Sequence, residues 1–225
     1  ESDYYRASIS RNGQYVVFGS TEDLLPEDTN DSLDAYVEKL SDNSLDLVSL
    51  SPEGTQFTDD PLIYAPFISG DGKYVTFSIV FNNDPYVNKI YIHNRTNNQT
   101  KELFSQEIDS LSKIYVSSIS NDGHFVVYAS SYIGGASTEA GPIYLYDNET
   151  EETTTLVSGN DHFSANISGN GQYISFGSLS GDLVPEDTND SSDIFLIENS
   201  LYNSFDSAKP LSWKAYQYED LNKSC

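Results

Sequence analysis

Cysteine and methionine are almost missing from this sequence. Its 225 residues include no methionine and one cysteine, Cys225, which is the last residue. A disulfide framework and a thiolate metal cluster are therefore excluded within the chain. Because there is no methionine, residue 1 is not a translation start, and we expect a mature chain or a piece of a longer one. A chain so poor in cysteine and rich in Asn, Ser, Thr and Tyr is typical of exported proteins, so we expect a secreted, cell-surface or periplasmic location.

Basic residues are also scarce. The 11 Lys and Arg residues face 35 Asp and Glu residues, which gives a formal net charge of −24 at pH 7. A surface this acidic repels nucleic-acid phosphates and anionic lipid headgroups, so we expect no nucleic-acid partner. No run of about eighteen apolar residues occurs, so we expect no membrane insertion. Hydrophobic residues make up 37% of the chain, enough for a core. The composition therefore predicts an acidic globular protein that attracts cations or cationic partners.

What the sequence does have is a fourfold internal repeat. A motif of the form x-Ile-Ser-x-(Asn/Asp)-Gly-x-(Tyr/Phe)-(Val/Ile)-x-(Phe/Tyr) occurs at residues 8–18, 67–77, 118–128 and 166–176. Its glycines are 59, 51 and 48 residues apart, at Gly13, Gly72, Gly123 and Gly171. A near-constant period of this size indicates a repeat architecture.

Each repeat predicts a set of antiparallel strands. The Asn-Gly or Asp-Gly pair lies between two apolar segments, which is the strongest local signal for a β-hairpin because both residues tolerate positive φ. No segment shows a sustained helical period, so each repeat is predicted to be a four-stranded meander, the unit of a propeller blade. A third strand is expected at 35–40, 89–94, 142–147 and 193–198, and a fourth at 45–51, 100–105, 153–158 and 210–216.

The repeats resemble a known family. The serine, the (Asn/Asp)-Gly turn, the strand that ends in Phe-x-Ser and a later strand such as residues 193–196 resemble the WD-like blades of TolB-type propellers, over roughly residues 4 to 216. The resemblance implies an all-β fold: a β-propeller of four four-stranded antiparallel blades in a single domain over residues 1–225. Propellers host enzymes, adaptors and lectins alike, so the resemblance is specific for fold and not for function. The expected repeat boundaries are approximately 4–54, 62–105, 114–159 and 163–216.

The size of the ring is a separate question. Propellers have about four to eight blades, so four blades either close a small ring or form part of a larger one. We expect a four-blade portion of a larger exported protein, with self-association of two copies as a further option. A β-sandwich is the alternative all-β fold, although it does not need four homologous units. The strand residues Tyr15, Tyr74 and Tyr173 are expected in the core.

Two of the repeats share an acidic loop. Residues 26–32, Pro-Glu-Asp-Thr-Asn-Asp-Ser, are identical to residues 185–191, and a further aspartate follows each copy two residues later. Asp, Asn and Asp at positions i, i+2 and i+6 can bring together the hard oxygen ligands that Ca²⁺ prefers. The absence of nearby His and Cys disfavours zinc and copper. The predicted calcium ligands are Asp28, Asn30, Asp34, Asp187, Asn189 and Asp193.

Turn capping is an equally good interpretation of these loops. Asp and Asn side chains often replace backbone partners in tight turns, so a purely structural loop stays open as the alternative to calcium. The second and third repeats lack the motif, and Lys89 stands at the position of Asp34, where its charge would repel a metal. We therefore predict at most two equivalent sites.

Catalysis has little support in the sequence. His93, His124 and His162 lie in different repeats and are expected at the surface. No Gly-x-Ser-x-Gly elbow, His-Glu-x-x-His helix or phosphate-binding glycine loop occurs. We predict a non-enzymatic binding or scaffolding module whose acidic surface meets a protein or glycan partner. The alternatives are a purely structural spacer and a carboxylate-dependent hydrolase or lyase.

Overall fold

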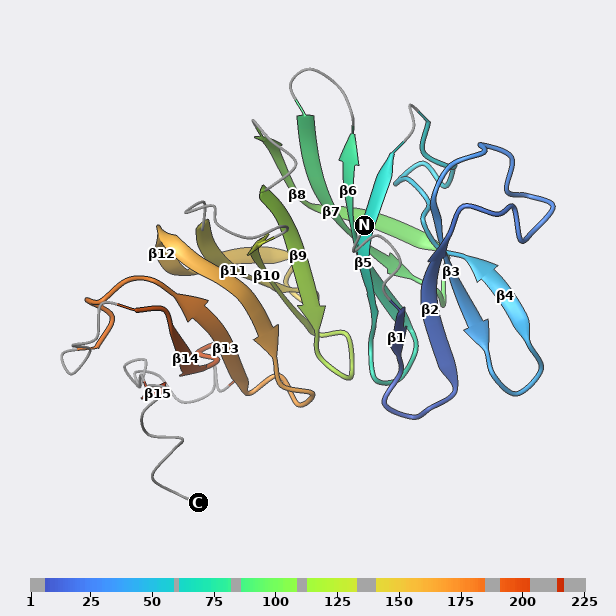
Figure 1. The fold of residues 1–225 in the computed structure, drawn as a ribbon. Helices are drawn as coiled ribbons and strands as arrows, with labels where there is room; N and C mark the ends of the chain where they lie inside the picture. The colour runs from blue at the N-terminus through green and yellow to red at the C-terminus, as the bar shows by residue number, and fades with distance from the viewer. Residues whose placement is uncertain are drawn as a thin grey trace.

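In a computed structural model of the chain, antiparallel strands are arranged side by side as a fan (Figure 1). The structure describes residues 7–58, 61–81, 86–108, 113–132, 141–184, 191–202 and 214–216. No helix occurs in these residues, and so none of them belongs to a helix that could cross a membrane.

The first two repeats form separate four-stranded sheets, as the sequence predicts. In both sheets the strands follow one another in chain order, and each is antiparallel to its neighbour. The first sheet contains β1 (Ala7–Ile9), β2 (Tyr15–Ser20), β3 (Asp34–Lys39) and β4 (Ser44–Leu47). The second contains β5 (Leu62–Ile68), β6 (Tyr74–Phe81), β7 (Tyr86–Asn94) and β8 (Gln99–Ile108).

The third and fourth repeats are joined in one seven-stranded sheet. Its strands are β9 (Lys113–Ile119), β10 (Phe125–Tyr132), β11 (Gly141–Asp147), β12 (Glu152–Ile167), β13 (Tyr173–Ser178), β14 (Asp193–Glu198) and β15 (Lys214–Tyr216). β12 serves both repeats, because its first half pairs with β11 and its second half with β13. The sequence predicts two strands here, whereas the structure has one strand with a bulge around Gly159, whose φ is +122°. The four sequence repeats thus form three sheets.

A serine-based turn explains why every repeat begins with the same hairpin. In the second repeat, the Ser69 hydroxyl donates to Asp71 Oδ1 (2.7 Å) and accepts from the main-chain N–H of Tyr74 (3.0 Å). Gly72 closes the turn at φ +79°, a conformation that glycine adopts without strain, and its N–H donates to the Ser69 carbonyl (3.0 Å). Equivalent bonds centre on Ser10, Ser120 and Ser168.

These turns are also hydrogen-bonded to one another, at the lower end of the molecule in Figure 1. The Asn12 N–H donates to the Gly70 carbonyl (3.2 Å), and the Asp71 N–H to the Asn121 carbonyl (2.8 Å). The Asn121 N–H in turn donates to the Gly169 carbonyl (2.8 Å). A Cβ atom on Gly70 or Gly169 would lie 2.4 Å from the Asn121 side chain, so both glycines permit this close approach. The line of turns fixes the spacing of the repeats.

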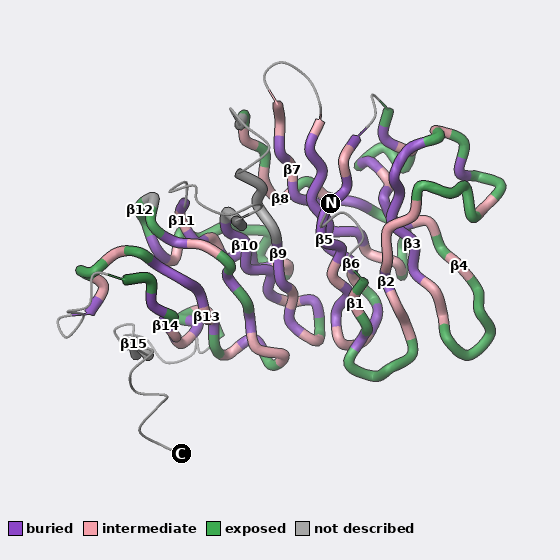
Figure 2. Tube along the Cα trace, viewed as in Figure 1, coloured by how far each residue is buried: buried purple, intermediate pink, exposed green. Residues whose placement is uncertain are grey.

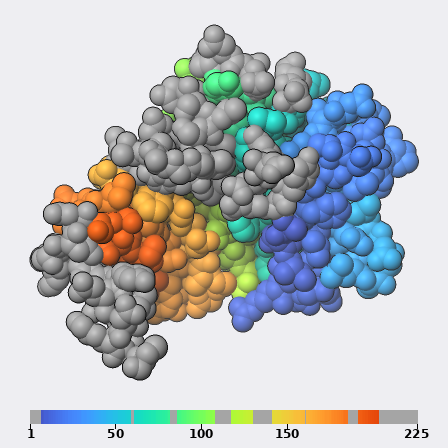
Figure 3. All heavy atoms as spheres, viewed as in Figure 1, coloured from blue at the N-terminus to red at the C-terminus, as the bar shows by residue number. Residues whose placement is uncertain are grey.

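The core lies between successive sheets. Val17 and Phe77 belong to a buried cluster between the first two sheets, and Ile92 and Val126 to one between the second and third. A third cluster, which includes Phe176, joins the third and fourth repeats. Figure 2 shows buried segments within all three sheets, and Figure 3 shows the repeats following one another across the molecule from blue to orange.

The two end sheets each carry an exposed isoleucine. Ile9 on β1 is 61% exposed, and Ile194 on β14 is 53% exposed. The prediction of a core position is wrong for Tyr173, which is 41% exposed, because no sheet in the described part of the chain covers that face. Tyr15 and Tyr74 are half-buried against the clusters between the sheets.

Candidate functional site

The acidic loop of the first repeat connects β2 to β3 and is fastened to the sheet by Tyr36. The Tyr36 hydroxyl accepts a hydrogen bond from the Leu24 N–H (3.4 Å) and lies within hydrogen-bonding distance of Asp28 Oδ2, to which it donates. Burial and the nearby Asp28 carboxylate both raise the pKa of Tyr36, so the hydroxyl keeps its proton. The loop therefore rests on a buried tyrosine of β3.

Asp28 is a buried carboxylate with donors on both oxygens. It is 4% exposed; Tyr36 donates to Oδ2, and Gln56 Nε2 donates to Oδ1 (2.6 Å). Gln56 Oε1 accepts from both the N–H and the hydroxyl of Thr29 (3.1 Å each). Gln56 lies 28 residues further along the chain than Asp28, so this contact fixes the loop to the segment that follows β4.

Asn30 caps the turn in the way that the structural interpretation predicts. Its Oδ1 accepts from the Ser32 N–H (3.1 Å), and its Nδ2 donates to the Phe57 carbonyl (3.1 Å). The first bond is an Asx-turn, and the second ties the loop to a buried phenylalanine. Asn30 is thus engaged on both polar atoms.

Asp34, the first residue of β3, has one oxygen without a donor. Its side chain is 2% exposed; Oδ1 accepts from the Ser49 hydroxyl (2.5 Å), and no residue in the described part of the chain donates to the buried Oδ2. Burial raises the pKa of Asp34 to about 6; the Ser49 hydroxyl and the nearby Asn30 amide oppose the rise, and the Asp28 and Asp23 carboxylates add to it. Buried carboxylate oxygens are costly unless a donor or a cation meets them.

Of the second acidic loop, the structure describes only the C-terminal end. Asp187 and Asn189 lie outside the described residues. Asp193 is the first residue of β14 and is 4% exposed. It pairs in register with Ser178, as Asp34 pairs with Ser20, so the two aspartates occupy equivalent positions.

Lys89 occupies the position equivalent to Asp34 in the second repeat, as the sequence predicts. It pairs with Ile79 on the neighbouring strand, and its ammonium group contacts the Glu102 carboxylate (2.7 Å). The other predicted counterparts of the acidic loop, around residues 82–85 and 134–140, lie outside the described residues.

The structure brings three of the six predicted ligands, Asp28, Asn30 and Asp34, into one loop. Most of their polar atoms are engaged by protein hydrogen-bond partners. Within the described ranges, no group of three or more His, Cys, Asp or Glu residues is arranged to hold a metal. The loop is therefore a turn capped by its own side chains. It leaves the Oδ2 atom of Asp34 as the place where a proton or a cation could bind.

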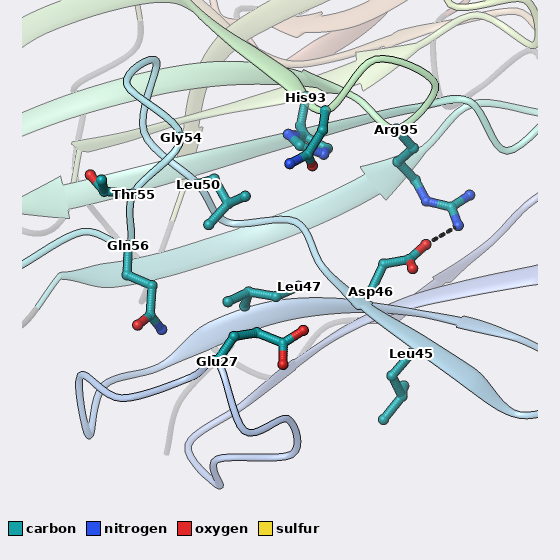
Figure 4. A pocket seen from close by; sticks show the side chains of 11 residues that line it. Glu27, Leu45, Asp46, Leu47, Leu50, Gly54, Thr55, Gln56, His93 and Arg95 are labelled. Atoms are coloured by element: carbon teal, nitrogen blue, oxygen red, sulfur yellow. Dashed lines mark hydrogen bonds and ion pairs between the residues drawn. The ribbon is translucent and has the colours of Figure 1, made fainter.

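A cavity of about 570 Å³ adjoins this loop (Figure 4). We call it the β4 groove, because three consecutive residues of β4 line it. Residues of the acidic loop, of the segment after β4 and of the β7–β8 turn complete its walls. The lining residues are Glu27, Leu45, Asp46, Leu47, Leu50, Gly54, Thr55, Gln56, His93, Arg95 and Asn98.

The prediction of surface histidines is wrong for His93 and His162, which are 1% and 2% exposed. His93 Nδ1 lies 2.9 Å from the Thr100 hydroxyl, and burial, with a smaller effect of Arg95, lowers the pKa of His93 to about 4. His93 is therefore neutral at pH 7 and lines the groove. Its place in a predicted strand, directly after Tyr91 and Ile92, was the signal that pointed to burial.

Solved structures with the same architecture are β-propellers. TolB from Acinetobacter baumannii matches with a TM-score of 0.51 and 18% identity, over 85% of this chain and 40% of that one. The β-propeller domain of the trilobed protease from Pyrococcus furiosus matches with a TM-score of 0.58 and 13% identity, over 94% and 56% of the two chains. A prolyl endopeptidase matches with a TM-score of 0.56 and 14% identity, over 92% and 28%.

These matches confirm the predicted fold class, an all-β chain with a TolB-like β-propeller fold. No protein-family model matches the sequence, and no curated protein matches it. The chain spans about half or less of the length of the propeller proteins it resembles. At these low identities the likeness concerns the fold alone.

Proposed function

We propose that this chain is a non-enzymatic binding and scaffolding module of an exported protein, and that it presents an acidic surface to a protein or glycan partner. The observation that carries the proposal is the β4 groove, a cavity of about 570 Å³ in a propeller-fold chain whose formal net charge is −24. Ligands bind in concave sites that combine apolar surface with polar groups, and this groove offers three leucines among polar and charged side chains. The near-absence of cysteine supports the exported location.

A ligand screen tests binding against the alternative of a structural spacer. We expect at least one member of a panel of soluble glycans and cationic peptides to raise the melting temperature with increasing concentration, because a ligand that binds only the folded state stabilises it. A panel without any concentration-dependent shift would favour the spacer. Turnover of a glycan or peptide in the same panel would contradict the non-enzymatic assignment.

The alternative of a carboxylate-dependent hydrolase or lyase has less support. The buried acids of the first repeat, Asp28 and Asp34, are hydrogen-bonded to Tyr36, Gln56 and Ser49. Neither aspartate lines the β4 groove; of the two carboxylates that do, Asp46 is paired with Arg95, which leaves the exposed Glu27. A catalytic acid needs to reach the substrate, within hydrogen-bonding distance or through one water.

A bound Ca²⁺ at the acidic loop is the second part of the proposal, and Asp34 is the observation that favours it. Its buried Oδ2 makes no hydrogen bond of normal geometry in the described part of the chain, although the Asn30 amide is close enough to lower the pKa of Asp34. The Asp28 and Asp23 carboxylates raise that pKa. A cation would neutralise this repulsion. Asp28, Asn30 and Asp34 would supply oxygens, and main-chain carbonyls and water would complete the shell of six to eight that Ca²⁺ takes.

Melting curves of two variants test the calcium site. We expect Ca²⁺ to raise the melting temperature of the wild type and EDTA to reverse the effect. Asp34→Asn should remove the response, whereas Asp31→Asn, which neutralises an exposed aspartate of the same loop, should keep it. Identical curves with and without Ca²⁺ would reject the site. An equal loss in both variants would show that the ion only screens charge.

A further inference from the structure

β4 is the outer strand of the first sheet, and no strand among the described residues pairs with its other edge. The Val48 N–H donates to the Ala35 carbonyl (2.9 Å), so the chain at position 48 turns its main-chain groups towards β3. Hydrogen-bonding groups alternate in direction along an antiparallel strand. The N–H and C=O groups of Leu45 and Leu47 therefore point outward, away from β3.

The β4 groove runs along this edge. Its lining includes Leu45, Asp46 and Leu47 in succession, which places the cavity beside the strand (Figure 4). His93 of β7 and Arg95 of the β7–β8 turn stand on one side in Figure 4, and Glu27 of the acidic loop on the other. An extended chain in the groove would meet unpaired main-chain groups between two walls of side chains.

Both walls are held in place by contacts within the protein. Arg95 donates to Asp46 Oδ2 and to the Gly72 carbonyl (2.5 Å each), and its guanidinium lies 4.5 Å from the centre of the Tyr15 ring. On the other side, Gln56 is fixed by its bond to Asp28. Fixed walls reduce the entropy that the protein side chains lose when a ligand binds, because the site is already formed.

The charge of the groove favours a basic ligand. Arg95 is already paired with Asp46, whereas the exposed Glu27 forms no ion pair with any residue that the structure describes. Leu45, Leu47 and Leu50 add apolar surface next to it. A lysine side chain suits this combination, because its aliphatic stem packs on leucine while the ammonium group reaches a carboxylate.

We propose that the β4 groove binds an extended, lysine-bearing peptide segment of a partner protein, which adds to β4 as a further strand. Addition of a strand to a free sheet edge is a general mode of peptide recognition, in which main-chain bonds give affinity and alternate side chains give specificity. The assignment rests on the proposed binding function and names its site and the class of its partner.

The outer strand of the second sheet, β8, differs from β4 because charged side chains protect its edge. β8 carries Lys101 and Glu102, which form ion pairs with Glu151 and Lys89. Charged side chains on an edge strand discourage pairing with another chain. β4, with the sequence Ser-Leu-Asp-Leu, has only Asp46 as a charged residue, and this side chain is turned to Arg95.

Peptide binding followed by fluorescence anisotropy tests the proposal. The probe is a labelled peptide of about eight residues in which threonine alternates with lysine and valine, a pattern suited to a strand. We expect it to bind the full chain at low salt. A peptide with glutamate in place of lysine should bind about tenfold more weakly, and one with methylated amides on its hydrogen-bonding edge should not bind.

Two matched pairs of variants locate the site. Leu45→Pro removes an outward N–H without removing a bond to β3, so the sheet should persist while affinity falls about tenfold, and Leu45→Ala should cost less. Glu27→Gln should weaken binding of the lysine peptide about threefold. Glu22→Gln, an exposed glutamate of the same loop outside the groove lining, should not.

The outcomes separate this site from the general function. Strand addition at β4 is overturned if the lysine peptide binds the wild type and Leu45→Pro with equal affinity. It is also overturned if the wild type binds the methylated and unmethylated peptides with equal affinity. If a ligand from the wider panel still raises the melting temperature, the binding function stands at another surface. If neither the peptide nor any panel member binds, both proposals fall. Should Leu45→Pro not fold, the methylated peptide decides the matter alone.

Discussion

Burial decides the charge of His93, which the sequence alone predicts at the surface. Its pKa is lowered to about 4 from an ordinary value of 6.5, mainly by burial and secondarily by Arg95. The unfolded chain therefore binds a proton more readily than the folded one between these values. The His93 contribution to stability is complete above about pH 6.5 and is lost as the pH falls towards 4.

Chemical unfolding at two pH values checks this prediction. Between about pH 7.5 and about pH 5.5, His93 should account for a loss of about 1 kcal/mol in the free energy of unfolding. His93→Asn should lower the pH dependence by that amount, whereas His124→Asn, at a partly exposed histidine, should keep the His93 contribution. An unchanged slope in His93→Asn would contradict the buried neutral state.

Glycine at positions 70 and 169 makes room for a neighbouring turn. A Cβ at Gly70 would lie 2.4 Å from Asn121 Oδ1 and 2.7 Å from its Cβ, so the strain cannot be relieved by moving only the end of a flexible side chain. We expect Gly70→Ala to destabilise the protein by about 2 kcal/mol. Gly181→Ala is the control, because nothing lies within 4 Å of its added Cβ.

Urea unfolding of the double variant shows whether contact with Asn121 is the cause. Gly70→Ala combined with Asn121→Gly should cost less than the sum of the two single changes, because the second removes the obstacle. Additive losses would mean that the close approach of the two turns does not explain the glycine.

At the scale of the element, the serine turn is the unit that the sequence repeats. Ser120 is fully buried, and its hydroxyl joins Asp122 Oδ1 (2.6 Å) to the Phe125 N–H (3.0 Å). Ser120→Ala leaves the buried N–H without a partner, which we expect to cost about 1–2 kcal/mol in urea unfolding. Ser168→Ala, at a more exposed turn, should cost less, because water can replace the hydroxyl. Equal losses would contradict the role of burial.

The elements differ in how far the sequence alone could predict them. Hairpins at the Asx-Gly pairs follow from local conformation, so their strands lie where the sequence places them. The joining of two predicted strands into β12 could not be foreseen, because Gly-Asn-Asp normally favours a turn. In the structure Gly159 lies in a bulge at φ +122° between the part of β12 that pairs with β11 and the part that pairs with β13. The donors to Asp28 and Asp34 come from Gln56 and Ser49, and such tertiary partners leave no local pattern.

On the scale of the whole molecule, the excess negative charge opposes compaction. A net charge of −24 in 225 residues produces repulsion between exposed carboxylates that salt screens. We expect the melting temperature to rise by a few degrees between about 0.01 M and about 0.3 M NaCl, where the Debye length shortens several-fold. A salt-independent melting temperature would mean that the carboxylates interact little in the folded state.

The exposed faces at the two ends of the fan belong to the same scale. Ile9 and Ile194 stand on the first and last sheets and have no covering sheet in the described ranges. Their exposure follows from the order of the repeats, since an interior sheet has a neighbouring sheet on both faces and an end sheet has one on a single face. This is also why an apolar strand residue such as Tyr173 could not be assigned to the core from its pattern alone.

The shared strand β12 makes the two C-terminal repeats a single mechanical unit. A pulling force applied across them would act on one sheet held together by this strand, whose bulges interrupt the pairing without separating the two repeats. The first two repeats are instead separate sheets connected by a loop that follows β4. Under tension the chain should therefore give way at the joints between sheets, while β9 to β15 resist and fail together.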